Sequence, residues 1–326
     1  MLCSLCSFLT SPLLLLLLPP LLYLLKKYFN GPMCLLSPDL SSKIAIITGS
    51  NTGIGKSTAL GLAKLGCTII LACRDTKKAE LAQAEIQRKT GNKKVHILAL
   101  DLSDLDSVRI FAKIFKEKFS TLDILVNNAG VMAFYERRLT KQGFEMQLGT
   151  NHLGHFLLTN LLLENLRKSE RGRVINVASL AHHYAKCDFD DIKSERSYGP
   201  NLAYGRSKLA NILFTRELAK RLEQEKSNIK VAALHPGVVI TELTRNLEEK
   251  FLVKAAVSLG RPIRYLFFKD TEHGAQTSLH CALVEWEKLE NGGYYADCKV
   301  KGTSGKAKDA KLMKEVWDIS ARAVGI

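Results

Sequence analysis

The chain has 326 residues, of which 46% are hydrophobic and 24% are charged, so it is globular in character and long enough for one sizeable core. Its 47 lysines and arginines exceed its 32 acidic residues, and the net charge is +15. Such a balance is compatible with an anionic membrane surface, a phosphorylated cofactor or nucleic acid. Because no arginine-rich arm or zinc-finger spacing occurs, we expect no nucleic-acid partner.

The amino terminus carries an uncharged, leucine-dominated run, Phe8 to Leu25, which ends at Lys26 and Lys27. These eighteen residues are just enough to span or anchor in a bilayer. Three prolines interrupt the run, so a monotopic or re-entrant anchor stays open beside a spanning one, and a cleaved secretory signal is the competing interpretation. We expect a membrane anchor over residues 1–27, a tether over 28–41 and one folded domain over 42–326.

From residue 43 onward, short β-branched runs alternate with longer helical patterns, which is typical of parallel βαβ units. The runs are apolar throughout, which predicts strands that are buried on both faces of a sheet. The expected strands are Lys43–Thr48, Thr68–Ala72, Val95–Leu100, Leu122–Asn127, Arg173–Val177, Lys230–Leu234 and Gly293–Ala296. The sequence therefore predicts an α/β fold with a single doubly wound (Rossmann) domain and a mostly parallel, seven-stranded sheet.

The first predicted strand ends at Thr48 and opens a glycine-rich turn that feeds a helix. In that context, backbone N–H groups can approach a pyrophosphate at the positive end of the helix dipole. A glycine-rich turn alone is a weak signal, and a plain tight turn is the alternative, but the position between strand and helix is what the motif requires. The residues expected to contact a dinucleotide here are Gly49, Ser50, Asn51, Thr52, Gly53, Ile54 and Gly55.

The second predicted strand leads into Arg74, nineteen residues past Gly55. A protein that reads an unphosphorylated ribose places a carboxylate here, whereas a guanidinium favours a 2′-phosphate through charge-assisted contacts. We therefore expect NADP(H) rather than NAD as the cofactor. A register shift of one residue would place Asp75 at this position and reverse the preference.

Two more strands are followed by polar segments, Asp101-Leu102 and Asn128-Ala129-Gly130. Ligands of open α/β sheets bind beyond the carboxyl ends of the strands, so we expect both segments to contact the dinucleotide. Capping of a loop is the alternative interpretation, and for Asp101 the two remain open.

Tyr204 and Lys208 lie one helical turn apart in a strongly helical stretch. Free tyrosine has a pKa near about 10, and a neighbouring ammonium, with a cationic nicotinamide in the oxidised complex, is expected to lower the pKa of Tyr204. The pair could then exchange a proton with the alkoxide that forms when hydride reduces a carbonyl. Ser179, at the end of the fifth strand, could donate a hydrogen bond to the substrate oxygen. The four-residue spacing of Tyr204 and Lys208 is common in proteins, and it indicates a catalytic pair here because the glycine-rich turn and Ser179 accompany it.

The order and spacing of these motifs, with His235-Pro236-Gly237 after the sixth strand, resemble the short-chain dehydrogenase/reductase family from about residue 42 to the carboxyl terminus. Stretches such as 151–156 and 207–220 are similar to membrane-anchored, NADP-dependent retinol dehydrogenases of the all-trans-retinal reductase type. The resemblance implies NADPH as cofactor, Pro236 and Gly237 beside the nicotinamide, and Lys208 on its ribose. It also implies a catalytic tetrad of Asn151, Ser179, Tyr204 and Lys208. Two departures are Ala178, where many members have serine, and the long interval between Ser179 and Tyr204.

The segment 238–270 mixes apolar and basic residues, and the fold predicts a flap over the substrate there. A flap of this kind on an anchored enzyme suits a lipophilic substrate drawn from the bilayer, although two ordinary amphipathic helices would give the same pattern. The resemblance favours retinol and retinal. A steroid, a lipid aldehyde or a xenobiotic carbonyl is an alternative substrate, and a non-catalytic NADPH-binding scaffold is a weaker alternative function.

We expect no metal site, because no third ligand stands at a credible spacing from the histidines His152, His155, His182, His183 and His235. The helices that carry Asn151 and Tyr204 form homodimer faces in many members of the family, so a homodimer and a monomer both remain open. Basic residues flank only the carboxyl side of the anchor, which predicts a domain facing the cytosol. We expect the endoplasmic reticulum membrane, with a mitochondrial membrane as the alternative.

Overall fold

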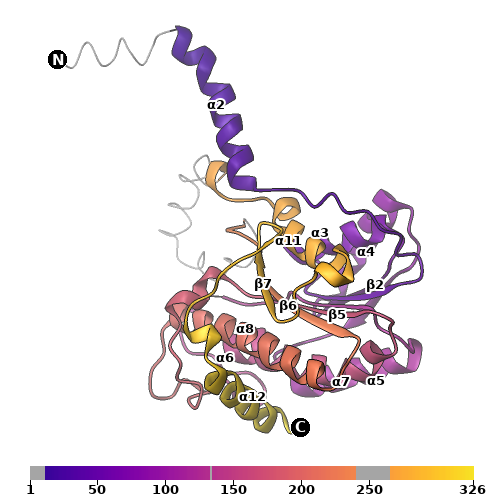
Figure 1. Cartoon of the computed structure of the whole chain (residues 1–326), viewed down its shortest axis with the longest axis vertical. Coiled ribbons are helices and arrows are strands. Elements are labelled where there is room, and N and C mark those ends of the chain that lie inside the picture. The colour runs from indigo at the N-terminus through magenta and orange to yellow at the C-terminus, as the bar shows by residue number, and fades with distance from the viewer. Residues whose placement is uncertain (1–11, 133, 240–264) are drawn as a thin grey trace, which may run out of the picture.

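The computed structural model describes residues 12–132, 134–239 and 265–326, and a mostly parallel sheet lies at the centre of the domain (Figure 1). Its strands are β1 (Ile44–Thr48), β2 (Thr68–Cys73), β3 (Val95–Ala99), β4 (Ile124–Asn127), β5 (Gly172–Val177), β6 (Ile229–His235), β7 (Gly293–Ala296) and β8 (Lys299–Val300). They are arranged in the order β3-β2-β1-β4-β5-β6-β7-β8. The chain crosses over between β3 and β4, and that switch places the carboxyl ends of β1 and β4 side by side.

The expected number of seven strands is too low by one, because β8 pairs antiparallel with β7. The turn between them consists of Asp297 and Cys298, both with positive φ (50° and 57°), as in the two-residue turns that join hairpin strands. A strand of two residues is too short to show an alternating pattern. The turn also lacks the glycine that usually marks this conformation, so its residues carry no local signal for a hairpin.

Helices cover both faces of the sheet, as Figure 1 shows. One face carries α3 (Gly53–Lys64), α4 (Thr76–Thr90) and α11 (Thr271–Leu283), and the other carries α5 (Leu105–Lys118), α7 (Gly154–Arg167), α8 (Pro200–Gln224) and α12 (Ala310–Val324). Shorter turns are α6 (Met146–Leu148), the π-helical turn η1 (Gly149–Leu153), and the 3₁₀ turns η2 (Leu180–Tyr184), η4 (Trp286–Lys288) and η5 (Lys306–Lys308). This is the doubly wound arrangement that the alternating sequence pattern predicts.

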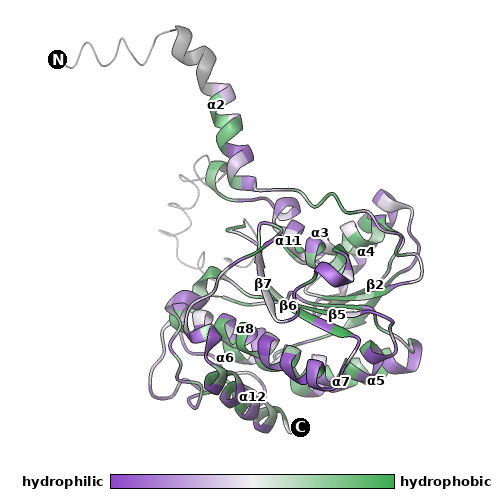
Figure 2. Cartoon of the chain, viewed as in Figure 1, coloured by the Kyte–Doolittle hydropathy of each residue, from purple (hydrophilic) through white to green (hydrophobic). Residues whose placement is uncertain are grey.

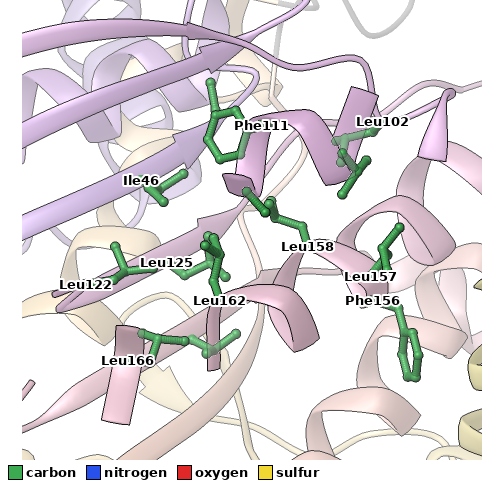
Figure 3. Packing of buried hydrophobic residues seen from close by; sticks show 14 of the residues in the cluster. Ile46, Leu102, Phe111, Leu122, Leu125, Phe156, Leu157, Leu158, Leu162 and Leu166 are labelled. Carbon is green, nitrogen blue, oxygen red and sulfur yellow. The ribbon is translucent and has the colours of Figure 1, made fainter. Parts of the chain in front are cut away.

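Each face of the sheet has its own apolar core because side chains alternate along every strand. Ile46 faces the cluster under α5 and α7, whereas its neighbour Ile47 faces the cluster under α3 and α11. Figure 3 shows Leu158 and Leu162 of α7 beside Leu125 of β4 in the first cluster. In Figure 2, β2 is mainly hydrophobic, while hydrophilic residues recur along α8 and α12. The two cores hold the strands in register, so the polar motifs that follow the strands lie together at the carboxyl edge of the sheet.

The carboxy-terminal helix α12 packs on α7 and α8, the two helices on which a homodimer face was expected. The Trp317 ring lies against Phe156 of α7, with ring centroids 5.0 Å apart, and near Phe214 of α8 at 5.9 Å. The Arg221 guanidinium lies 4.2 Å from the centre of the same indole. Part of the expected dimer face is therefore covered by the chain itself.

The amino-terminal helix α2 (Pro12–Asn30) projects from the domain (Figure 1). It continues past the predicted end of the anchor at Lys27, and residues 1–11 of the anchor lie outside the described residues. Within the part of the chain that the structure describes, no helix combines the length and the apolar character needed to cross a bilayer. The base of α2 rests on the domain: Lys26 donates a hydrogen bond to the Phe268 carbonyl (2.6 Å), and the Phe29 and Phe267 rings meet edge to face.

Phe156→Ala should lower the free energy of unfolding by about 3–5 kcal/mol, because the fully buried ring contacts two other helices and its removal leaves a cavity. Denaturant titration of the full chain measures the loss. Leu81→Ala on α4 is the control, since that side chain is 74% exposed and its truncation should change stability by less than about 0.5 kcal/mol. Equal effects of the two substitutions would contradict the packing described here.

Candidate active site

A cleft of about 310 Å³ opens at the carboxyl edge of the sheet. It begins beside β2, crosses the ends of β1 and β4, and reaches the ends of β5 and β6. Of the residues predicted to bind cofactor or act in catalysis, the structure brings all into the cleft wall except Ser50 and Asn151. Those in the wall are Gly49, Asn51, Thr52, Gly53, Ile54, Gly55, Arg74, Asp101, Leu102, Asn128, Ala129, Gly130, Ser179, Tyr204, Lys208, Pro236 and Gly237.

The glycine-rich turn forms the part of the wall between β1 and α3. Gly49 and Gly53 have positive φ (63° and 59°), which side chains with a Cβ rarely adopt. A Cβ on Gly55 would collide with the Gly49 carbonyl oxygen, so the turn can be this tight only with glycine. At the helix start, the Thr52 side chain makes no capping hydrogen bond. The first N–H groups of α3 thus remain available to an anion, which fits a pyrophosphate.

Ser50 has a different role from the one predicted for it. Its side chain is fully buried, and its hydroxyl donates a hydrogen bond to the Ile47 carbonyl (2.7 Å). The hydroxyl also lies 3.4 Å from the Cys73 Sγ at the end of β2. Ser50 therefore stabilises the turn from behind instead of facing the cleft.

The Thr48 hydroxyl joins the turn to the next strand end. It accepts hydrogen bonds from the backbone N–H groups of Asn128 and Ala129, both at 2.9 Å. Its oxygen also lies 2.8 Å from Nε2 of His155, whose Nδ1 lies 3.0 Å from the Asn151 carbonyl oxygen. Because a carbonyl only accepts, Nδ1 carries the proton and Thr48 donates to Nε2. Burial lowers the pKa of His155 to about 3, so the ring is neutral.

The β2 end of the cleft is lined by Arg74, Asp75 and Lys78. The Arg74 side chain is 66% exposed and lies 3.8 Å from the Asp101 carboxylate. Asp75 caps α4 by accepting a hydrogen bond from the Lys78 backbone N–H. The carboxylate that could have reversed the cofactor preference is thus bonded to its own helix, while the guanidinium stands at the edge of the cleft. Lys78 was missed by the sequence reasoning, although its position three residues into α4 was a usable signal.

Ser179 and Tyr204 meet at the opposite end of the cleft. A hydrogen bond with Ser179 acts on the Tyr204 hydroxyl, and the Ser179 Oγ also accepts a hydrogen bond from the Ala181 N–H at 3.2 Å. Tyr204 comes from α8, which packs directly on η2. The two elements approach closely at Gly205, where an added Cβ would lie 2.8 Å from the Ala181 carbonyl oxygen. A hydroxyl pair at this position can share hydrogen bonds with one substrate oxygen.

Lys208 lies beneath this pair, with its Nζ 5.5 Å from the centre of the Tyr204 ring. The ammonium donates a hydrogen bond to the Val177 carbonyl (3.0 Å), and burial lowers its pKa to about 8. The expected lowering of the Tyr204 pKa is wrong for the protein groups alone. Burial raises the pKa of Tyr204 to about 12, and this effect outweighs the opposing hydrogen bond from Ser179.

Asn151 lies in the π-helical turn η1 that precedes α7, where an ordinary helix was expected. Its side-chain amide is engaged within the protein: Oδ1 accepts from the Val131 N–H (2.8 Å), and Nδ2 donates to the Val131 carbonyl (2.9 Å) and to Ser207 Oγ (3.0 Å). These contacts hold the segment after Gly130.

Two further predictions concern the surroundings of the cleft. Residues 240–264 of the expected flap lie outside the described residues, and only its ends are seen, where the Lys269 N–H donates to the Val238 carbonyl (2.8 Å). Among the described residues, no cluster of three or more side chains is arranged to hold a metal ion. Buried histidines of this region instead bond to protein groups, as His152 does with Asn211 and Ser320.

Comparison with known proteins gives consistent results. The short chain dehydrogenase family profile matches residues 43–251. Retinol dehydrogenase 11 of Homo sapiens is 45% identical over 322 residues, which are 97% of each chain, and retinol dehydrogenase 12 of Mus musculus is 46% identical over 93% of this chain and 92% of its own. A crystal structure of an uncharacterized protein from Mycobacterium paratuberculosis matches with a TM-score of 0.72 and 35% identity, covering 90% and 98% of the two chains. The RhlG/NADP active-site complex of Pseudomonas aeruginosa matches with a TM-score of 0.61 and 26% identity over 78% and 94%.

The doubly wound sheet, the glycine-rich turn and the cleft at the switch point define an oxidoreductase of the class that uses NAD(P)(H). The chain belongs to the short-chain dehydrogenase/reductase family. Within that family it is a retinol dehydrogenase-like enzyme.

Gly55→Ala should weaken NADPH binding by about tenfold or more, because the new methyl group collides with the Gly49 carbonyl and forces the turn apart, at a cost of about 1–3 kcal/mol. Fluorescence titration with NADPH measures the effect. Gly302→Ala is the matched control, since a Cβ there meets no atom within 4 Å. Unchanged binding in the Gly55 variant would contradict the assignment of this turn to the dinucleotide.

Proposed function

We propose that the protein uses NADPH to reduce a lipophilic carbonyl, with all-trans-retinal as the favoured substrate. The observation that carries this proposal is one continuous cleft. It has the glycine-rich turn and Arg74 toward β2, and Ser179, Tyr204 and Lys208 toward β5. A dinucleotide bound along the cleft supplies hydride at the β5 end, where the acid/base side chains are gathered.

In this mechanism Tyr204 donates the proton. Its hydroxyl is held by Ser179, so both groups can bond to the carbonyl oxygen of the substrate. As the carbonyl carbon is reduced, negative charge gathers on that oxygen and the Tyr204 proton moves to it. A pKa near about 12 in the protein alone keeps the phenol protonated at neutral pH, which is the form that reduction requires.

Lys208 and Asn151 support the reacting groups. Burial lowers the pKa of Lys208 to about 8, so the side chain is still mainly protonated at neutral pH and its positive charge favours loss of the Tyr204 proton. A Cβ on Gly130 would lie 3.6 Å from the Lys208 Nζ, and 3.3 Å from Asn151 Oδ1. We assign Lys208 to the nicotinamide ribose as well, and Asn151 to positioning the loop that begins at Gly130.

The cofactor preference rests on charge at the β2 end of the cleft. Arg74 and Lys78 are cations in the wall, and Asp75 is held by α4, so the site suits a ribose 2′-phosphate. Asp101 and Leu102, with Asn128 and Ala129, are assigned to the dinucleotide by their place at neighbouring strand ends. Pro236 and Gly237 are assigned to the nicotinamide side.

The substrate class is supported by the names of the relatives and by the amino terminus. The relatives are retinol dehydrogenases, and retinoids partition into bilayers. Leu21, Leu22 and Leu24 of α2 are 40–60% exposed, next to Lys26 and Lys27. We propose that this segment, with the residues before it, anchors the enzyme in the endoplasmic reticulum membrane with the domain in the cytosol.

Tyr204→Phe should lower kcat for all-trans-retinal by about 10²–10⁴-fold, because the general acid is removed while the ring and its packing remain. NADPH affinity should change by less than about twofold. Steady-state assays in detergent or vesicles, with a parallel NADPH titration, test this. Tyr28→Phe, at an exposed ring on α2, is the control. Retained turnover in Tyr204→Phe would remove this residue from its proposed role.

Arg74→Ala should weaken NADPH binding by about tenfold while NADH binding changes little, because a charge-assisted hydrogen bond contributes about 1.5–3 kcal/mol. Arg88→Ala on α4 removes an equal charge from an exposed position away from the cleft and should leave both affinities unchanged. Equal weakening of NADPH and NADH by Arg74→Ala would argue against 2′-phosphate recognition.

A further inference from the structure

A buried histidine outside the cleft wall lies directly behind Ser179. His182 is the third residue of η2, and its side chain is completely buried. Its Nδ1 lies 2.7 Å from the Ser179 carbonyl oxygen, and the backbone N–H of Ser304 donates to its Nε2 at 3.3 Å. The ring therefore bridges Ser179, at the end of β5, and the segment between β8 and η5.

The chemistry of the two partners fixes the state of this ring. A backbone carbonyl only accepts, so the proton must be on Nδ1, and a backbone N–H only donates, so Nε2 must be bare. Burial lowers the pKa of His182, which agrees with a neutral ring. A protonated ring, or the other tautomer, would place two donors or two acceptors face to face at one of these contacts.

The position of Ser179 depends on such a contact from behind. Ser179 is extended (φ −162°, ψ 160°) and stands between the last residues of β5 and the tight turn η2. Its carbonyl accepts from both the backbone N–H and the Nδ1 of His182, at 3.2 and 2.7 Å. The ring thus binds the carbonyl of Ser179, while the hydroxyl of the same residue bonds to the Ala181 N–H and to Tyr204.

The His182 ring is itself fixed by packing. It meets the Tyr294 ring of β7 edge to face, with centroids 5.3 Å apart, and it lies 4.0 Å from the His183 ring. Since β7 and the Ser304 segment both follow β6 along the chain, the carboxy-terminal part of the chain sets the orientation of the ring.

We propose that His182, as the neutral Nδ1–H tautomer, is a positioning residue that holds the Ser179 hydroxyl at the angle needed for the substrate oxygen. It does not touch substrate or cofactor, and it acts only through the Ser179 backbone. This inference rests on the proposed hydride transfer, in which Ser179 bonds to the substrate oxygen.

Two isosteric substitutions test the two hydrogen bonds of the His182 ring one at a time. The amide nitrogen of asparagine falls near the imidazole Nδ1, so His182→Asn keeps the donor to Ser179. The glutamine amide reaches the Nε2 position, so His182→Gln keeps the contact with Ser304 and loses that donor. We expect His182→Gln to lower kcat for all-trans-retinal by about 10–100-fold, as small misplacements in active sites do, and His182→Asn to stay within about threefold of the wild type. His183→Asn, at the exposed neighbour, should be silent.

The readouts distinguish positioning from a loss of folding. NADPH affinity and the thermal midpoint should be nearly the same in the Asn and Gln variants, so that kcat alone differs. In a Ser179→Ala background, His182→Gln should have no further effect on kcat, because the group on which it acts is gone. Equal kcat in the Asn and Gln variants, or additive losses in the double variant, would overturn the inference.

Nitrogen NMR of the full-length protein labelled on histidine gives a test that does not depend on turnover. His182, identified by the resonance that His182→Asn removes, should show a protonated Nδ1 and a bare Nε2. The reverse tautomer or a charged ring overturns the inference even if the enzyme reduces retinal. If the predicted tautomer is seen and Ser179→Ala keeps full kcat, then the proposed role of Ser179 fails, and the positioning role of His182 fails with it.

Discussion

The hydroxyl of Thr48 is the contact on which the geometry of the cleft depends. Parallel strands are joined by bonds along their length, but beyond their carboxyl ends each loop could move independently. Thr48 removes that freedom by accepting two N–H groups from the loop after β4 while donating to His155. His155 in turn donates to the Asn151 carbonyl. The glycine-rich turn, the Asn128–Gly130 segment and the π-helical turn therefore form one hydrogen-bonded unit.

The side chains that join this unit are shielded from competition with water. Thr48 and Asn151 are fully buried, and His155 is 2% exposed. An unpaired polar group at this depth raises the free energy of the folded state, so each hydrogen bond of this series favours the next one. The hydrogen bond from Thr48 also requires a neutral His155, since a charged ring could not accept it. The rigidity of the cleft follows from the need to satisfy these buried groups.

Burial is the main influence on the pKa values of the two acid/base groups in the cleft. Burial opposes charge on both Tyr204 and Lys208, and it moves their pKa values apart, to about 12 and about 8. The Lys208 ammonium donates a hydrogen bond to the Val177 carbonyl and lies 5.5 Å from the centre of the Tyr204 ring. The expected lowering of the Tyr204 pKa relied on the lysine and the nicotinamide cation together. Among the groups of the protein itself, desolvation has the largest effect on the Tyr204 pKa and raises it.

Most of the fold could be predicted because its signals are local. The buried parallel strands appear as continuous apolar runs, and the glycine-rich turn requires glycine at Gly49, Gly53 and Gly55 whatever the tertiary context. By contrast, the Asp297–Cys298 turn carries no glycine, and the π-helical turn at Asn151 looks like ordinary helix in the sequence. Such features are decided by distant packing, which a single sequence does not display.

The same distinction applies to the site. Most of the predicted residues in the cleft wall follow strand ends, which can be recognised from hydrophobic runs, whereas Tyr204 and Lys208 lie in α8 and were found by their helical spacing. Ser50 was misplaced because a side chain at a strand end can point behind the turn as easily as into the cleft. The hydrogen bonds of His155 to Thr48 and of His182 to Ser304 could not be predicted, since the partners are more than 100 residues away in the sequence.

The buried Lys269 side chain lies close both to the chain just after the amino-terminal helix and to the wall of the cleft. Its side chain is 8% exposed and forms an ion pair with Asp297 at 2.7 Å. Cβ atoms on Gly31, just after α2, and on Gly237, in the cleft wall, would lie 2.9 Å and 2.7 Å from the Lys269 side chain. A buried ammonium that lost its carboxylate would be strongly unfavourable, so the pair resists separation. The chain after α2, the Gly237 wall and the β7–β8 turn are therefore held at fixed distances, and the amino-terminal segment is part of the framework of the cleft.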